Sequence, residues 1–446
     1  MTDRRSFLSS LVAGGLLARR AHRHALGPGR VRASGPALPT ADQRQWQDLE
    51  VGMFVHFGPA TWRDPAHPDQ PVPITAITPD IDTDQWVSVA RDLGARYVVL
   101  VAKHQDGFCL WPTQTTDYSV LNTPWRLGHG DLMAELAASC RSAGLALGVY
   151  LSPRDDNFGA GVEGRCDTPV KQSIYNVFYR QQLTELLTRY GEMAEVWFDG
   201  SVVVPVGDIL AAYAPHAMVF QGPQATIRWV GNEDGFAPYP AWNALPGAAA
   251  ATGTATAKDG DPDGDAWLPL EADVSIRRPD WFWSAADGRN LLSLGALLEV
   301  YYRSVGRGAQ LLLNLPPDRT GHIPEADAAR ARAFGDEVRR RFGTPLAETR
   351  GSGNEVVLRL PSPAAVDHVI LQEDLAAGER VRQFTLEGRV AGAWRALGGG
   401  TAIGHKRIQP VPSTTVDAVR LIVTRSADTP RIRRLAAFAT GAVVPT

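Results

Sequence analysis

Between Val51 and Pro317 the chain alternates short apolar runs with amphipathic stretches. Each run is nearly continuous in hydrophobic residues, as expected of strands that are buried on both faces of a parallel sheet. The clearest runs cover residues 52–58, 96–104, 145–153, 194–201, 217–222 and 309–317. This rhythm predicts an α/β fold in which the strands are parallel.

Helical periodicity fills the intervals between these runs. Trp86 and Leu93 fall on one face of a predicted helix, and Asp131 is placed to cap the next one. Two less certain strands within residues 265–285 complete the set that an eight-stranded barrel requires. An open doubly wound sheet would normally carry a Gly-rich phosphate turn after its first strand, and the sequence has none. We therefore predict a (β/α)8-like TIM barrel over residues 40–343.

The pattern changes beyond Thr344, where short strands of alternating polarity are separated by Gly, Pro and Ser. This pattern predicts a C-terminal β-sandwich over residues 345–446. The segment resembles a discoidin-like module, which either binds sugar or braces the domain before it. We expect a brace, because Trp394 is the one obvious aromatic platform in this segment.

The N-terminus predicts export. Arg4 and Arg5 stand before an apolar run from Leu8 to Ala18, which is the pattern of a twin-arginine signal. The run is too short to span a bilayer permanently, and no other stretch reaches the length of a transmembrane helix. A disordered basic N-terminus with a chance arginine pair is the alternative. We expect residues 1–35 to direct export across a bacterial inner membrane, to the periplasm or the medium.

Composition excludes some classes of function. The 446 residues carry a net charge of −3, which gives no general electrostatic grip on nucleic acid. The three cysteines are too few for a disulfide scaffold and lack the spacing of a structural zinc site. The fold must therefore rest on packing.

In a barrel of parallel strands, functional groups sit on the loops at the carboxyl ends of the strands. Asp199 follows an apolar strand and precedes a glycine, which favours a catalytic nucleophile on a rigid base. A helix N-cap would use the same residue type. His56 and His104 end two other strands and suit either sugar hydroxyls or, with Asp106, a metal. No familiar metal-binding spacing favours the metal.

Several longer runs carry a family resemblance. They are GMFVHFGPATW, KHQDGFCLWPTQTTDYSV, EVWFDGS and LLLNLPPDRTGHI. In this order and at these intervals, over residues 45–325, they resemble glycoside hydrolase family 29, the retaining α-L-fucosidases. The resemblance implies an irregular barrel followed by a β-sandwich, which is the architecture predicted above from the pattern alone.

The resemblance implies roles for residues that match the family's motifs. The aspartate of the WFDG motif, Asp199, would be the nucleophile, and His56 and His104 would hold fucose hydroxyls. Where relatives commonly have a second histidine, this chain has Gln105, which keeps a hydrogen-bonding amide but no titratable group.

Other strand-end residues are expected around the sugar. Tyr150 and Trp197 are expected to contact the substrate, whereas Lys103 and Asp106 are expected to brace their loop. The apolar methyl group of fucose requires an aromatic wall. Candidates for that wall are Phe57, Trp62 and Trp283.

The general acid/base is harder to place, because its position varies among subgroups of the family. The run WLPLEADVSIRRPDWFW resembles the pattern of the subgroup that acts on α-1,3 and α-1,4 linkages, and its glutamate is Glu271. Glu233, in GNEDG, is the rival. We favour Glu271, because an apolar and aromatic stretch follows it and would raise its pKa. Arg277 is expected to support the sugar or the acid/base loop. VYLSPRDD also agrees with the subgroup, except that Arg154 replaces a common tryptophan.

The implied reaction is a double displacement. Asp199 attacks the anomeric carbon while Glu271 protonates the leaving oxygen, and Glu271 then activates water to hydrolyse the fucosyl-enzyme. This chemistry needs no metal or organic cofactor. The expected partner is a fucosylated oligosaccharide or glycoconjugate. Two other functions stay open: a hydrolase of a related sugar such as an α-L-galactoside, and a carbohydrate-binding protein without turnover.

Overall fold

The computed structural model describes residues 36–63, 70–286, 288 and 290–442. The predicted export signal, residues 1–35, lies outside the described residues. Within the described ranges, no helix combines the length and the apolar character that crossing a bilayer requires.

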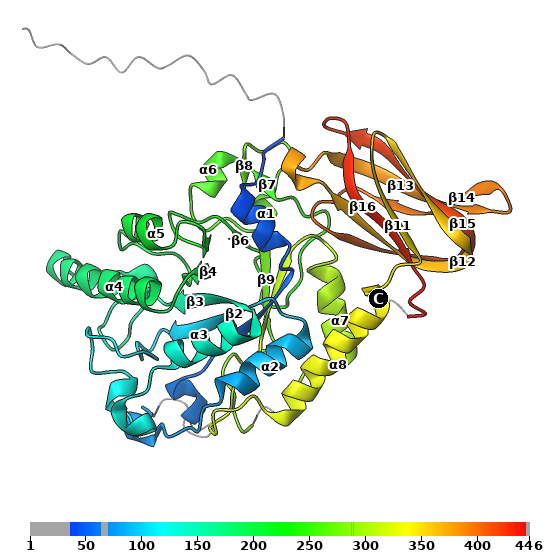
Figure 1. The fold of residues 1–446 in the computed structure, drawn as a ribbon. Coiled ribbons are helices and arrows are strands. Elements are labelled where there is room, and N and C mark those ends of the chain that lie inside the picture. The colour runs from blue at the N-terminus through cyan, green and yellow to red at the C-terminus, as the bar shows by residue number, and fades with distance from the viewer. Residues whose placement is uncertain (1–35, 64–69, 287, 289, 443–446) are drawn as a thin grey trace, which may run out of the picture. The chain divides into compact units, whose positions relative to one another are not determined.

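Eight parallel strands form a sheet that nearly closes on itself (Figure 1). Their order is β5-β4-β3-β2-β1-β10-β9-β6, and a bridge between Phe220 and Ile227 brings the two edges together. The strands are β1 (Val51–Val55), β2 (Tyr97–Lys103), β3 (Ala146–Leu151), β4 (Met193–Trp197), β5 (Met218–Phe220), β6 (Arg228–Trp229), β9 (Leu270–Ser275) and β10 (Gln310–Asn314). This arrangement confirms the predicted TIM-like barrel.

The weaker strand predictions are only partly correct. One strand expected within residues 265–285 is confirmed as β9. The other is wrong, because the remaining barrel strand is β6, which lies earlier in the chain. With only 2 residues, β6 is too short to produce a hydrophobic pattern. The short β8 (Ala266–Trp267) pairs instead with β7 (Ala244–Leu245) in a separate two-stranded sheet.

Large side chains fill the inside of the barrel. The buried interior cluster includes Phe54, Tyr97, Val99, Tyr150, Trp197, Phe220 and Leu312. Gly52 makes room for one of them, because a Cβ at this position would lie 2.3 Å from Cζ of Tyr97. The absence of a side chain at Gly52 therefore leaves room for the Tyr97 ring against β1.

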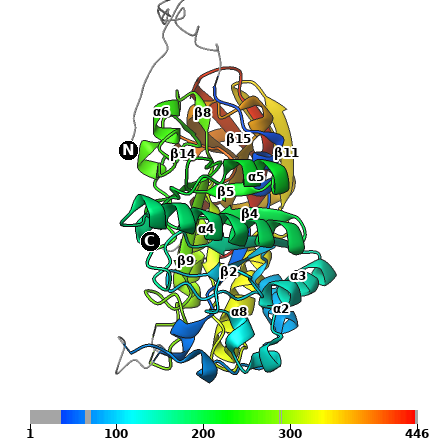
Figure 2. The same cartoon turned by 90° about the vertical axis from the view of Figure 1, so that its left-hand side faces the viewer.

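Helices cover the outside of the barrel, and α3, α2 and α8 lie side by side (Figures 1 and 2). Asp131 caps α3 as predicted, since its carboxylate accepts a hydrogen bond from the Ala134 amide at 3.0 Å. The helices are α1 (Ala41–Gln47), α2 (Thr83–Leu93), α3 (Leu132–Ala143), α4 (Pro169–Arg189), α5 (Gly207–Tyr213), α6 (Gly247–Ala250), α7 (Leu294–Arg303) and α8 (Glu325–Phe342).

The chain after α8 forms a six-stranded antiparallel sheet in the order β11-β16-β12-β15-β13-β14. Its strands are β11 (Ala347–Ser352), β12 (Glu355–Glu373), β13 (Val381–Val390), β14 (Ala393–Gly400), β15 (Arg407–Ser426) and β16 (Arg431–Phe438). Two long strands, β12 and β15, shift register along their length and enclose a separate apolar core. The predicted β-domain is thus built from one continuous sheet.

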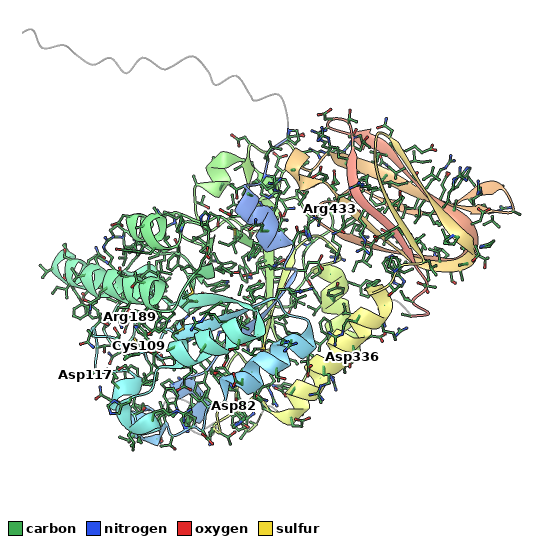
Figure 3. All side chains as sticks on the ribbon, in the orientation of Figure 1. Asp82, Cys109, Asp117, Arg189, Asp336 and Arg433 are labelled. Atoms are coloured by element: carbon green, nitrogen blue, oxygen red, sulfur yellow. The ribbon has the colours of Figure 1, made fainter. Side chains whose placement is uncertain are left out.

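Polar contacts tie this sheet to the barrel. His405 and Arg433 both bind Asp48 at the end of α1, at 2.9 and 2.8 Å. Figure 3 labels Arg433. Near the end of α7, Tyr302 bonds to the buried His368 at 2.8 Å. Trp394 has the guanidinium of Arg420 4.4 Å from its ring centroid, so its face is partly covered. These contacts fit the expected brace.

Candidate active site

Asp199 lies two residues after the end of β4 and is half-buried. Its Oδ2 accepts hydrogen bonds from the Tyr150 hydroxyl at 3.0 Å and from Gln105 Nε2 at 2.8 Å. Among the described residues, none donates to the other oxygen, Oδ1. The next helix, α5, begins only at Gly207, so Asp199 is not an N-cap. The structure therefore brings together three predicted residues and leaves one carboxylate oxygen free.

The two predicted histidines lie beside each other at this end of the barrel, with ring centroids 5.8 Å apart. His56 Nδ1 bonds to Asn314 Oδ1 at 2.8 Å, and Asn314 ends β10. His104 stacks on the Tyr150 ring at a centroid distance of 5.8 Å. His104 is thereby joined through Tyr150 to Asp199.

Burial sets the charge of both histidines. It lowers the pKa of His56 well below the ordinary value, and the neighbouring His104 lowers it further. Burial also lowers the pKa of His104 to about 4. Both rings are therefore neutral near pH 7. His56 uses its donor, Nδ1–H, on Asn314 Oδ1 and keeps Nε2 as an acceptor, whereas His104 keeps one donor and one acceptor. Such a pair suits sugar hydroxyls, which both donate and accept hydrogen bonds.

Two aromatic residues that the sequence interpretation missed stand against the histidines. The Phe282 ring lies 5.4 Å from His56 and 5.1 Å from His104, centroid to centroid. Trp281 lies 5.0 Å from His56. Of the predicted aromatic wall, Phe57 is buried and packs on Trp86 in the outer core, away from these rings. The apolar side of the site therefore comes from the loop after β9.

Hydrogen bonds of Lys103 and Asp106 hold the loop after β2 in place, as predicted. Lys103 has no exposed surface and binds Asp155 and Gln182, each at 3.0 Å. Asp106 accepts a hydrogen bond from the Phe108 amide at 3.0 Å, and burial raises its pKa to about 6. Both side chains therefore fix the loop that carries His104 and Gln105.

The structure does not bring Glu271 to this end of the barrel. Glu271 is the second residue of β9 and has 0% exposure. Its carboxyl group accepts hydrogen bonds from Trp197 Nε1 at 2.8 Å and from the Tyr97 hydroxyl at 3.1 Å, and Glu195 is its neighbour in the interior. Burial raises the pKa of both glutamates. Trp197 likewise points inward, stacked on Phe220 with centroids 3.8 Å apart.

Glu233 occupies a different position. It lies in the loop that follows β6, at the carboxyl end of a barrel strand, and its side chain is 42% exposed. Arg278 Nη1 stands 3.4 Å from Glu233 Oε2. Deeper in the barrel, Asp273 accepts a hydrogen bond from Trp229 Nε1 at 2.5 Å, and burial raises the Asp273 pKa to about 8.

Arg277 serves the loop rather than an open site. Its guanidinium forms two hydrogen bonds to Asp327, at 2.7 and 2.8 Å, and only 5% of the residue is exposed. Asp327 lies in the first turn of α8. The structure therefore places Arg277 where it supports the loop after β9, the second of the two roles expected for it.

The missed residues differ in how well the sequence marks them. Asn314 ends a clearly predicted strand, so the strand-end rule would have found it. Arg154 also follows a predicted strand, and its Nη1 lies 3.3 Å from Gln105 Oε1. No hydrophobic or motif pattern marks Trp281 and Phe282 as site residues. They lie in the loop after β9, and the path of that loop places their rings beside the histidines.

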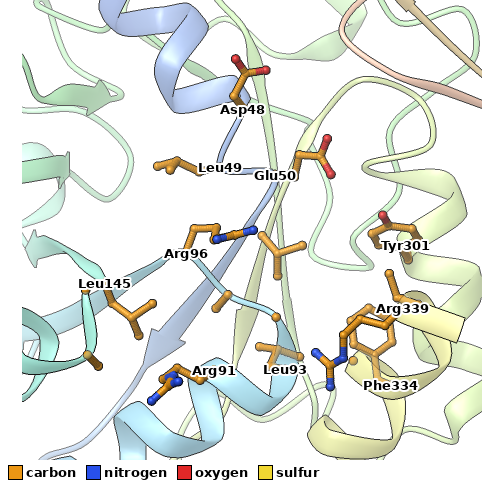
Figure 4. Close-up of a pocket in the computed structure, with 17 residues that line it drawn as sticks. Asp48, Leu49, Glu50, Arg91, Leu93, Arg96, Leu145, Tyr301, Phe334 and Arg339 are labelled. Carbon is orange, nitrogen blue, oxygen red and sulfur yellow. The ribbon is translucent and has the colours of Figure 1, made fainter. Parts of the chain in front are cut away.

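A cavity of about 640 Å³ lies at the opposite end of the barrel, beside the first residues of β1 and β2 (Figure 4). Its lining includes Glu50, Arg96, Tyr301, Phe334 and Arg339. None of the predicted site residues contributes to it. In parallel barrels this end serves stability and not chemistry, so we place the candidate active site around Asp199.

Comparison with known proteins identifies the family of this chain. A family model described as alpha-L-fucosidase matches residues 78–340. Alpha-L-fucosidase 1 of Arabidopsis thaliana is 34% identical, over 90% of this chain and 87% of that protein. A putative alpha-L-fucosidase of Bacteroides thetaiotaomicron superposes with a TM-score of 0.85 at 31% identity, over 90% of this chain and 99% of the other. A family 29 fucosidase of Ruminococcus gnavus in complex with fucose gives a TM-score of 0.79 at 26% identity, over 92% and 97% of the two chains. The chain belongs to the alpha-L-fucosidase family, glycoside hydrolase family 29.

Proposed function

We propose that the protein is an exo-acting, retaining α-L-fucosidase that removes terminal α-1,3- or α-1,4-linked fucose and uses Asp199 as its nucleophile. The observation that carries this proposal is the arrangement of donors on Asp199. Tyr150 and Gln105 both bond to Oδ2, and no donor from the described part of the chain occupies Oδ1, the oxygen that would attack. Oδ1 would bond to the anomeric carbon as the glycosidic C–O bond breaks, and water would later displace the carboxylate from the same carbon.

We assign the general acid/base to Glu233 instead of Glu271. An acid/base must reach both the leaving oxygen and water, and Glu233 is at the rim with 42% of its side chain exposed. Glu271 has no exposed surface, and both of its oxygens are held by the barrel interior. In the first step Glu233 gives its proton to the leaving oxygen, and in the second it takes one from water.

The sugar itself would lie between the histidines and the aromatic loop. Neutral His56 and His104 would each hold a hydroxyl group, since Nε2 of His56 can accept from one and His104 has both a donor and an acceptor. Phe282 stands against both rings and would face the apolar methyl group of fucose.

The linkage preference rests on the resemblance of residues 267–283 and 231–235 to the α-1,3/1,4 subgroup. The test is fucose release by wild-type protein from Lewis-type trisaccharides and from an α-1,2-linked trisaccharide. We expect at least about tenfold higher kcat/KM on the Lewis-type substrates, which corresponds to 1.4 kcal/mol. Equal rates on both would contradict the subgroup, and an initial product with inverted anomeric configuration in ¹H NMR would contradict the retaining mechanism.

Two rival functions are separated by the same assay. A hydrolase of α-L-galactosides would release 4-nitrophenol faster from the aryl α-L-galactoside than from the aryl α-L-fucoside. A carbohydrate-binding protein without turnover would release it from neither, while fucose would still raise the melting temperature. We expect release from the aryl fucoside, because Asp199 and Glu233 are both present at the rim.

The twin-arginine pattern supports a further proposal, that the protein acts outside the inner membrane. Replacing Arg4 and Arg5 by lysine keeps the charge and removes the motif that the export system reads. We expect the native chain in the periplasmic fraction and the double variant in the cytoplasm. Equal distribution of the two would mean that the pair is a chance feature of a basic N-terminus.

A further inference from the structure

Two residues that depart from the family's motifs touch each other next to the nucleophile. Gln105 replaces a common histidine, and Arg154 replaces a common tryptophan. Arg154 Nη1 donates to Gln105 Oε1 at 3.3 Å, and Gln105 Nε2 donates to Asp199 Oδ2 at 2.8 Å. The two departures therefore form one continuous chain of hydrogen bonds that ends on Asp199.

A glutamine at this position needs a partner that selects its orientation. The two ends of an amide have nearly the same shape but opposite hydrogen-bonding character. With Nε2 toward Asp199 the amide donates to the carboxylate, whereas with Oε1 toward Asp199 two oxygen atoms would repel each other. A guanidinium has donors only, so Arg154 can donate a hydrogen bond to Oε1 but cannot form one with Nε2, which is also a donor.

Arg154 is itself held in place by Asp156. Its Nε and Nη2 donate to the two carboxylate oxygens of Asp156 at 2.7 and 3.1 Å. The Asp156 amide in turn donates to the Gln105 carbonyl oxygen at 2.8 Å. This pairing leaves Nη1 of Arg154 for the Gln105 side chain and links the loops after β2 and β3.

We propose that Arg154 is a positioning residue, which orients the Gln105 amide so that Asp199 always receives a donor on Oδ2 and keeps Oδ1 for the anomeric carbon. This inference rests on the proposed function, because it takes Asp199 as the nucleophile. Arg154 acts through Gln105 and not on the sugar. Its loss therefore lowers kcat and leaves KM nearly unchanged.

The test is a double-mutant cycle with 4-nitrophenyl α-L-fucoside, using Arg154→Ala, Gln105→Ala and the double variant. We expect each single variant to lose about tenfold in kcat, as for one charge-assisted hydrogen bond, with KM within about twofold. The double variant should be no slower than Gln105→Ala alone, because Arg154 then has nothing to orient. The Arg154 side chain is 41% exposed, so added guanidinium should restore Arg154→Ala but not the double variant.

Arg165→Ala is the matched control. Arg165 pairs with Glu163, which is two residues away, just as Arg154 pairs with Asp156. Arg165 lies in the same loop region and forms no bond to a described site residue. We expect it to keep wild-type kcat. Fully additive losses in the cycle, a loss confined to KM, or an equal loss in Arg165→Ala would overturn the role of Arg154.

Arg154→Met covers the case in which the alanine variant fails to fold, since it keeps the length of the side chain, and it should show the same loss of kcat. Retained activity in Asp199→Asn would instead overturn the proposed function, whatever the cycle shows.

Discussion

Two groups of carboxyl side chains occupy one barrel under opposite conditions. At the carboxyl ends of the strands, Asp199 is half-buried and accepts two hydrogen bonds on one oxygen. Deeper inside, the neighbouring Glu195 and Glu271 have no exposed surface, and burial raises the pKa of both. The carboxylate at the rim can therefore react with a ligand, whereas burial favours the protonated, uncharged form of the two interior carboxyl groups.

The position of a carboxyl group along its strand determines which of these two environments it occupies. On β9, Glu271, Asp273 and Ser275 alternate with Ala272 and Val274, so the three polar side chains share one face. Glu271 lies four residues before the end of the strand, which corresponds to roughly 13 Å. At the start of this face the Glu271 carboxyl group contacts the core, whereas Ser275 at its end accepts a hydrogen bond from Asn314, the partner of His56.

The sharpest test of the rim group is Asp199→Asn. The amide keeps the shape of the carboxylate but cannot attack the anomeric carbon, so kcat/KM should fall by about 10⁴-fold or more, with little change in melting temperature. The control is Glu271→Gln, which should keep most of the activity, because Glu271 has no contact with a rim group other than through Trp197. A reversed pattern, with Glu271→Gln inactive and Asp199→Asn active, would exchange the roles of the two groups.

A second test concerns the acid/base. Glu233→Ala should lose about 10²- to 10⁴-fold on a trisaccharide, whose leaving group needs protonation, and much less on 4-nitrophenyl α-L-fucoside. Azide should restore the rate with the aryl substrate only, giving a fucosyl azide. Asp234→Ala is the control, because Asp234 also faces Arg278, at 3.3 Å. Azide rescue of Glu271→Ala, without rescue of Glu233→Ala, would assign the acid/base role to the buried Glu271.

These contrasts show what the sequence can and cannot reveal. Burial on both faces makes barrel strands continuous in apolar residues, so β1 to β5 and β10 are visible in the pattern. Motif matching also finds Asp199, His56 and His104, because each ends such a strand. The 2-residue strand β6 leaves no pattern, and for that reason the sequence does not show that Glu233 follows a barrel strand. Whether Glu271 begins or ends β9 depends on strand register, which the residues alone do not encode.

The loop after β9 offers a comparison between a buried and an exposed arginine. Arg277→Ala should destabilise the fold by about 3–5 kcal/mol, because it leaves the buried Asp327 carboxylate without its partner. Arg278→Ala removes a partly exposed ion pair and should cost no more than about 1 kcal/mol. Urea unfolding of both variants measures the difference. Equal costs would mean that the Arg277–Asp327 pair does not anchor α8 to this loop.

The last test concerns the pH dependence of stability, which changes gradually with each pH unit. Burial raises the Asp273 pKa to about 8, so the native state keeps a proton that the unfolded chain loses near pH 4. The resulting stabilisation is complete below pH 4 and is lost as pH rises to about 8, by at most about 1.4 kcal/mol per pH unit. Asp273→Asn keeps an acceptor for Trp229 and removes this loss, so its stability relative to wild type should increase steadily from pH 5 to pH 8 in urea unfolding. Asp208→Asn should show no such trend, because hydrogen bonding to Arg180 lowers the Asp208 pKa to about 2 and the group is ionised in both states over this range. A flat difference for Asp273→Asn would mean that Asp273 is ionised in the folded barrel and belongs with the rim carboxylates, not with the interior pair.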